Sequence, residues 1–285
     1  MDTAVIVLFW LALSATAVSG LIYIKNFFSK REVGWLDSLA GDLAVASFVL
    51  LALSLLLHWF YWRIPEIGVP FSARTIYALS LIGVYLLIES VSSARTAKVK
   101  IAGMLVMPAA LLLEFYAWAG YRLEYGLSVQ LRSYWVAMHV FFALIAYGAI
   151  TVALTLALIH IVEERQLKRK VSLSQIFRKF PSLETLDDFG YKAITFGFAF
   201  LTLVILTGAI RAQMLPQWQR WWMDPKILSA AAMWLVFGFY LASRNLLGWR
   251  GRRASFLAIL GFIVGLFTYF VNYILPSIHT YGRGF

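Results

Sequence analysis

The chain alternates between long apolar segments and short polar ones. Apolar runs of about 20 residues recur along it, which is the length that a helix needs to cross the hydrocarbon core of a bilayer. Since backbone polar groups in lipid must be satisfied within their own segment, each run predicts a transmembrane helix. The predicted spans are residues 3–24, 38–60, 74–94, 99–120, 133–161, 190–211, 227–243 and 254–275. The pattern predicts an all-α, polytopic membrane protein with about eight transmembrane helices.

The spans divide into two groups. We interpret residues 1–130 as an N-terminal group of four transmembrane helices, and residues 131–285 as four helices that carry the candidate site. The long connection at residues 162–189 is basic at its start and acidic near its end, and it predicts a short amphipathic segment. The first span lacks a basic n-region and a small-residue cleavage site, so we expect a retained helix rather than a signal peptide.

The composition agrees with a membrane protein and narrows the chemistry. Hydrophobic residues make up 61% of the 285 residues and charged residues 14%, which excludes a soluble domain of this size. We therefore attribute the net charge of +11 first to basic loops beside the membrane, and we expect no nucleic-acid partner. The chain has no cysteine, which excludes disulfides, thiolate ligands and thiol redox chemistry. His, Met, Tyr or carboxylate groups would have to hold any metal or haem iron.

The basic residues alternate between the two sides of the membrane. The first, third, fifth and seventh loops contain 17 of the 25 Lys and Arg residues, and the termini and remaining loops contain the other 8. Cytoplasmic loops carry the excess of Lys and Arg, so these four loops are predicted to be cytoplasmic. We therefore predict that both termini, and the loop between spans six and seven, face the outer side.

The outer loop at residues 215–226 is rich in tryptophan. Trp218, Trp221 and Trp222 lie within five residues of one another, and Asp224 and a proline follow. Three indoles form a large flat apolar surface with N–H donors at its edges, on which a planar cofactor such as haem could lie. The alternative is an aromatic belt, because Trp favours the headgroup region of any bilayer.

The positions of the other tryptophans and of the histidines favour an outer site. Most tryptophans lie at outer helix ends or in outer loops, and only Trp35 and Trp249 lie near the inner face. A generic belt would decorate both interfaces. Three of the four histidines share the outer side, and they are His58, His139 and His279. His160, at the inner end of span five, is expected to snorkel to the interface. Glu114, near the outer end of span four, has two interpretations: an intramembrane carboxylate, which is costly and often functional, or a side chain that reaches the headgroups.

Several stretches, taken in order and spacing, resemble one protein family. They are residues 134–139, 146–147, 183–194, 197–209, 215–226, 248–254, 267–272 and 279–282. This ordered set resembles the CcsA (ResC) members of the cytochrome c assembly family, which includes CcmC and CcmF and handles haem on the outer side of the membrane. The resemblance covers about half of the chain and adds little over its first 130 residues.

The resemblance implies a haem b site. The family uses two outer-face histidines on either side of the Trp-rich loop as axial haem ligands, and these carry over onto His139 and His279. The predicted site residues are His139, His279, Trp218, Trp221, Trp222 and Asp224. Two imidazoles would satisfy both axial positions of the iron, and axial ligation is a main control on its reduction potential. Arg220 and Lys226 would meet the propionates.

The resemblance also implies a role in cytochrome c biogenesis. The protein would hold haem, transiently or stably, and present it to a Cys-x-x-Cys-His apocytochrome c as a component of a haem lyase. The thioether chemistry would belong to reduced haem and the substrate thiols. A ResB-type membrane protein is the implied partner, and the implied location is a bacterial plasma membrane or a thylakoid membrane.

Two departures from the family pattern keep alternatives open. Trp222 sits one place early, and Ala242 occupies the position of a seventh-span histidine in members that carry haem through the bilayer. A HemX-like regulator or scaffold linked to haem biosynthesis fits these departures. A bis-histidine cytochrome that passes electrons to quinone would need histidine pairs within the bilayer, and His58 with His139 could form only one.

Overall fold

The protein is a bundle of long helices. The computed structural model describes residues 2–29, 34–62, 70–91, 101–121, 134–168, 180–213 and 222–277. These residues form eight α-helices and no strand: α1 (Asp2–Phe28), α2 (Gly34–Trp62), α3 (Pro70–Val91), α4 (Gly103–Gly120), α5 (Tyr134–Lys168), α6 (Leu183–Gln213), α7 (Pro225–Leu247) and α8 (Arg252–Ile274). Each contains a stretch that is long and apolar enough to cross a bilayer. The predicted all-α, multi-pass membrane architecture is confirmed.

Helices α5 and α6 extend beyond their predicted spans. α5 continues to Lys168 and α6 already begins at Leu183, so the described parts of the connection 162–189 are mostly helix and form no separate amphipathic segment. On the α5 extension the Lys168 ammonium lies 2.5 Å from the Glu164 carboxylate, one turn earlier. Such pairs support a helix outside the apolar region, where hydropathy alone predicts its end.

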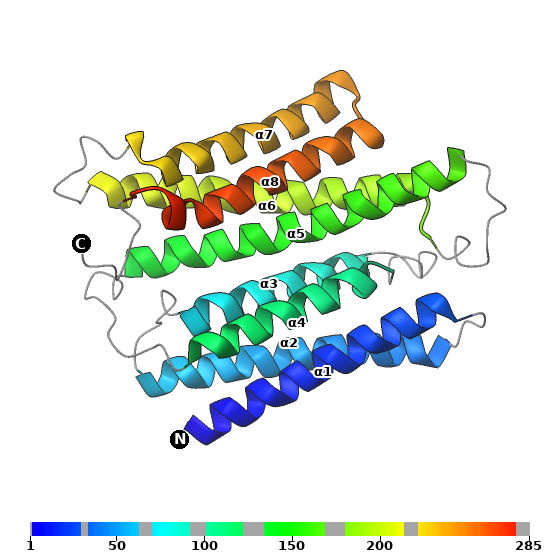
Figure 1. Cartoon of the computed structure of the whole chain (residues 1–285), viewed down its shortest axis with the longest axis vertical. Coiled ribbons are helices and arrows are strands. Elements are labelled where there is room, and N and C mark those ends of the chain that lie inside the picture. Colours follow the sequence, from blue (N-terminus) through cyan, green and yellow to red (C-terminus); the bar gives the residue numbers. More distant parts are fainter. Residues whose placement is uncertain are drawn as a thin grey trace.

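Consecutive helices run in opposite directions (Figure 1). Helices α1, α3, α5 and α7 begin at one end of the bundle, and α2, α4, α6 and α8 finish there. We call this the site end, because the described candidate residues lie there. The antiparallel order brings residues far apart in sequence to one face of the molecule.

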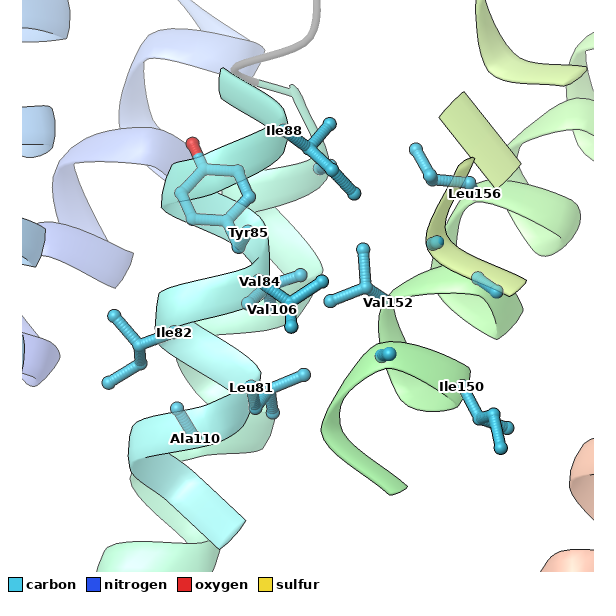
Figure 2. Packing of buried hydrophobic residues seen from close by; sticks show 14 of the residues in the cluster. Leu81, Ile82, Val84, Tyr85, Ile88, Val106, Ala110, Ile150, Val152 and Leu156 are labelled. Atoms are coloured by element: carbon cyan, nitrogen blue, oxygen red, sulfur yellow. The ribbon is translucent and has the colours of Figure 1, made fainter. Parts of the chain in front are cut away.

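The two groups of four helices meet where α3 packs on α5. Figure 2 shows Leu81, Val84 and Ile88 of α3 directed toward Val152 and Leu156 of α5. The buried core continues across this contact, which we call the α3–α5 seam. The division of the chain near residue 130 stays a prediction.

Of the two interpretations of Glu114, the one in which its side chain reaches the headgroups was wrong. Its side chain is fully buried. The Thr16 hydroxyl on α1 donates to Glu114 Oε1 at 2.7 Å and lies 2.5 Å from the Ser47 hydroxyl on α2. A polar side chain in a bundle can be satisfied by neighbouring helices rather than by water, and here three helices share one polar cluster.

His160 also departs from expectation. It is only 3% exposed and therefore does not snorkel. It lies beneath the turn between α7 and α8, where a Cβ at Gly251 would be 3.6 Å from its ring. The same turn is tied to α6 through Asp187, which accepts from the Gly251 N–H at 2.9 Å and pairs with Arg244 at 2.5 Å. Packing of three helix ends over the imidazole explains its burial.

Candidate functional site

His139 lies in the second turn of α5 at the site end, and its imidazole faces α6. The ring is half-buried. Its Nδ1 lies 3.0 Å from the carbonyl oxygen of Val204 and 3.3 Å from the hydroxyl of Thr207. Helices α5 and α6 pack side by side over much of their length, which brings the start of one to the end of the other. The imidazole is thereby held by groups from a second helix.

The partners of His139 determine which ring nitrogen carries the proton. A carbonyl oxygen can only accept a hydrogen bond, so the short contact to Val204 requires an N–H at Nδ1. In the neutral imidazole the lone pair then lies on Nε2. This arrangement, in which one ring nitrogen donates to a carbonyl and the other binds the metal, is the usual state of a metal-ligating histidine.

Gly208 makes this close approach possible. A Cβ at Gly208 would lie 3.0 Å from Cε1 and 3.3 Å from Nδ1 of His139. Both distances are tighter than ordinary van der Waals contact, so only glycine leaves the imidazole its observed place without displacement. The surface of α6 at Gly208 therefore leaves space for the imidazole ring of His139.

Asp224 joins the start of α7 to the segment that follows α8. Its Oδ1 accepts hydrogen bonds from the backbone N–H of Lys226 at 2.9 Å and of Ile227 at 3.4 Å, so it is the N-cap of α7. The Ser277 hydroxyl donates to the same oxygen at 3.0 Å. Asp224 is buried, and the geometry assigns it a structural tie between the end of the Trp-rich loop and the C-terminal segment.

The Trp-rich loop is only partly described. Trp222 belongs to a short turn just before Asp224 and its side chain is 56% exposed at the site end. Trp218, Trp221 and His279 lie outside the described residues, as does Arg220. The aromatic platform and the second axial ligand therefore stay predictions. The described chain ends at Ser277, two residues before His279, and Ser277 is tied to Asp224.

Several other aromatic residues at the site end are packing groups. Trp118 of α4 stacks on Tyr121, with ring centroids 5.1 Å apart, and on Phe9 of α1. His58 is buried against Phe71 of α3, with ring centroids 5.5 Å apart. His58 thus packs on α3 while His139 faces α6, an arrangement that does not favour the bis-histidine electron carrier.

Three residues that contact or make room for the His139 imidazole were not predicted from the sequence. Thr207 and Gly208 lie in the stretch 197–209 that carried the family resemblance, but nothing in their type assigned them a role. Val204 contributes a backbone carbonyl, which every residue possesses, so no sequence signal identifies it. A Thr-Gly pair near the end of a helix was the one visible hint, since small residues mark places of close helix approach.

The residues present fit a haem. A histidine that binds haem iron needs a lone pair on one ring nitrogen and a hydrogen-bond partner for the other. The contact of His139 Nδ1 with the Val204 carbonyl gives the ring this state. Trp222 offers exposed aromatic surface at the same end of the bundle.

Comparisons with known proteins all point to cytochrome c assembly proteins. Residues 39–279 match the model of the family described as cytochrome C assembly protein. The cytochrome c biogenesis protein CcsA of Guillardia theta is 36% identical over 168 residues, which cover 53% of this chain and 55% of that protein. The protein of the same name in Chlamydomonas reinhardtii is 33% identical over 189 residues, covering 64% and 52%. That of Mesostigma viride is 27% identical over 291 residues, covering 93% and 92%.

The alignments with the first two relatives span about half the length of those proteins. The family match, by contrast, begins at residue 39 and continues to residue 279. It therefore includes most of the first four helices, where the sequence alone showed little resemblance.

Proposed function

Because the chain belongs to the cytochrome c assembly protein family, we propose that it holds haem at the outer face of the membrane and presents it for covalent attachment to apocytochrome c. The observation that supports this most directly is the state of His139. Its Nδ1 proton is committed to the Val204 carbonyl, so Nε2 is the nitrogen that binds iron.

The chain's own residues would bind, orient and enclose the cofactor. His139 and His279 would each supply one imidazole nitrogen to the iron. Asp224 holds Ser277, two residues before His279 in the sequence, beside the start of α7. Trp218, Trp221 and Trp222 cover a face of the ring. When bound, haem supplies the vinyl groups to which the cysteine thiols of the apocytochrome add.

The proposed setting is a membrane complex. A ResB-type protein would be the partner, and the membrane would be a bacterial plasma membrane or a thylakoid membrane. The HemX-like regulator is not favoured, because the relatives named above are all cytochrome c biogenesis proteins.

The visible spectrum of the purified full-length protein tests the proposal. We expect a haem b spectrum that changes with reductant. His139→Gly and His279→Gly should each open one axial position, and added imidazole should restore the wild-type spectrum because it occupies the vacated space. His160→Gln, at the opposite end, serves as the control and should leave the spectrum unaltered. Unchanged spectra in both Gly variants, or a dependence on His160 alone, would contradict the proposal.

A further inference from the structure

The contacts of His139 lead to an inference that rests on the proposed function and extends it. We propose that Thr207 and Gly208 of α6 are positioning residues, which hold the His139 imidazole in the orientation and tautomer that binds iron through Nε2. Neither side chain would touch the haem; both would act through the ligand.

Thr207 can only accept a hydrogen bond from the imidazole. A hydroxyl has one proton, and the Thr207 hydroxyl lies 2.7 Å from the Leu203 carbonyl oxygen and 3.2 Å from that of Val204, both of which are acceptors. Its proton is therefore used within α6. The lone pairs of Thr207 Oγ1 then face His139 Nδ1 at 3.3 Å.

Both contacts of Nδ1 therefore require the same tautomer. The Val204 carbonyl and the Thr207 hydroxyl each accept from the Nδ1 proton, and neither can donate to a ring nitrogen in this arrangement. A ring with its proton on Nε2 would place two lone-pair-bearing oxygens against an Nδ1 lone pair. One turn of α6 thus favours the tautomer with its proton on Nδ1, which leaves the Nε2 lone pair to bind iron.

Gly208 fixes the position of the ring, while Thr207 and the Val204 carbonyl together fix its tautomer. The absent Cβ leaves the space that His139 Cε1 and Nδ1 occupy, at 3.0 and 3.3 Å from where that carbon would be. The two consecutive residues therefore act on the same imidazole from one helical turn. Groups that orient a metal-ligating histidine commonly affect metal affinity about 10- to 100-fold.

A substitution at a second glycine of α6 distinguishes an effect on His139 from a general packing defect. Gly197 lies on the same helix and also faces α5, where a Cβ would be 3.1 Å from the Ala149 side chain. Gly197→Ala therefore disturbs the same pair of helices to a similar degree without touching His139. Gly190, where nothing lies within 4 Å of such a Cβ, gives a second control on α6.

The experiment is a titration of the purified full-length protein in lipid nanodiscs with haem b, followed by absorbance and by the ferric spin state. We expect Gly208→Ala and Thr207→Val to weaken haem affinity about tenfold and to convert six-coordinate low-spin haem to a high-spin form. Imidazole should restore the low-spin spectrum. Thr207→Ser keeps the hydroxyl and should resemble wild type, as should Gly197→Ala and Gly190→Ala.

The outcomes distinguish the inference from the function on which it rests. If wild type binds no haem, the proposed function and the inference fall together. If His139→Gly loses the axial ligand while Gly208→Ala and Thr207→Val keep the wild-type spectrum and affinity, the inference alone is wrong. It is also wrong if Gly197→Ala loses as much affinity as Gly208→Ala, or if imidazole restores none of the variants, because both results indicate a packing defect.

Discussion

At the scale of single residues, Asp224 shows how a motif residue can act indirectly. It was predicted among the cofactor-binding residues, and the structure places its carboxylate on two backbone N–H groups of α7 and on the Ser277 hydroxyl. Each of these three contacts needs only an oxygen acceptor. The side chain therefore joins the start of α7 to the segment after α8, and we expect any effect on haem to follow from that geometry.

This role predicts different outcomes for two substitutions. Asp224→Asn keeps an acceptor and a good N-cap, so haem content should stay near wild type. Asp224→Ala removes the cap and should lower the free energy of unfolding by about 1 kcal/mol, with a loss of haem. Thermal unfolding and haem content of the purified variants measure both. Equal haem loss in Asn and Ala variants would instead indicate that the carboxylate charge itself meets the cofactor.

Some residues of the candidate site could be predicted from the sequence, and others could not. His139 and Asp224 were predicted as site residues because they lie in stretches that carry the family resemblance. The tautomer of His139 was not predictable, since it depends on a carbonyl that α6 places beside it. Ser277 escaped for a similar reason, because its contact with Asp224 depends on how the end of α8 folds back to α7.

At the scale of the elements, the existence of the helices was predictable and their pairing was not. In lipid both the buried and the lipid-facing sides of a helix are apolar, so periodicity does not distinguish them. On α4, Ala110 is fully buried and Leu112 is 71% exposed, although both are hydrophobic. The better signal for a contact is a small residue, as at the α3–α5 seam.

Gly148 of α5 lies close against α3 at that seam and gives a prediction. A Cβ there would lie 2.7 Å from the Ser80 side chain and 2.8 Å from its backbone carbon, and backbone atoms cannot yield cheaply. Gly148→Ala should therefore lower the free energy of unfolding by about 1–3 kcal/mol. Gly190→Ala, with open space, should be neutral or slightly stabilising because Ala favours helix.

Denaturant unfolding in mixed micelles, followed by circular dichroism, measures the Gly148→Ala effect. Equal stability of the Gly148 and Gly190 variants would mean that α3 and α5 approach less closely than the structure shows. In that case the core would not continue across the seam.

At the scale of the whole molecule, the antiparallel order of the described helices explains why the described candidate residues share one end of the bundle. The start of α5, the end of α6, the start of α7 and the end of α8 all lie at the site end (Figure 1). Segments separated by more than a hundred residues can thus contribute to one surface. The structure defines which residues share an end, and the distribution of basic residues predicts which side of the membrane that end faces.

The orientation of the bundle is therefore a prediction of its own. The basic loops follow α1, α3, α5 and α7, at the end opposite the site, and the positive-inside rule directs that end to the cytoplasm. Reporter fusions after Lys98, Arg169 and Arg250 should all report the cytoplasm, and a fusion at the C-terminus should report the outer side. The antiparallel order links these positions, so a single fusion on the wrong side would contradict both the orientation and an outward-facing haem site.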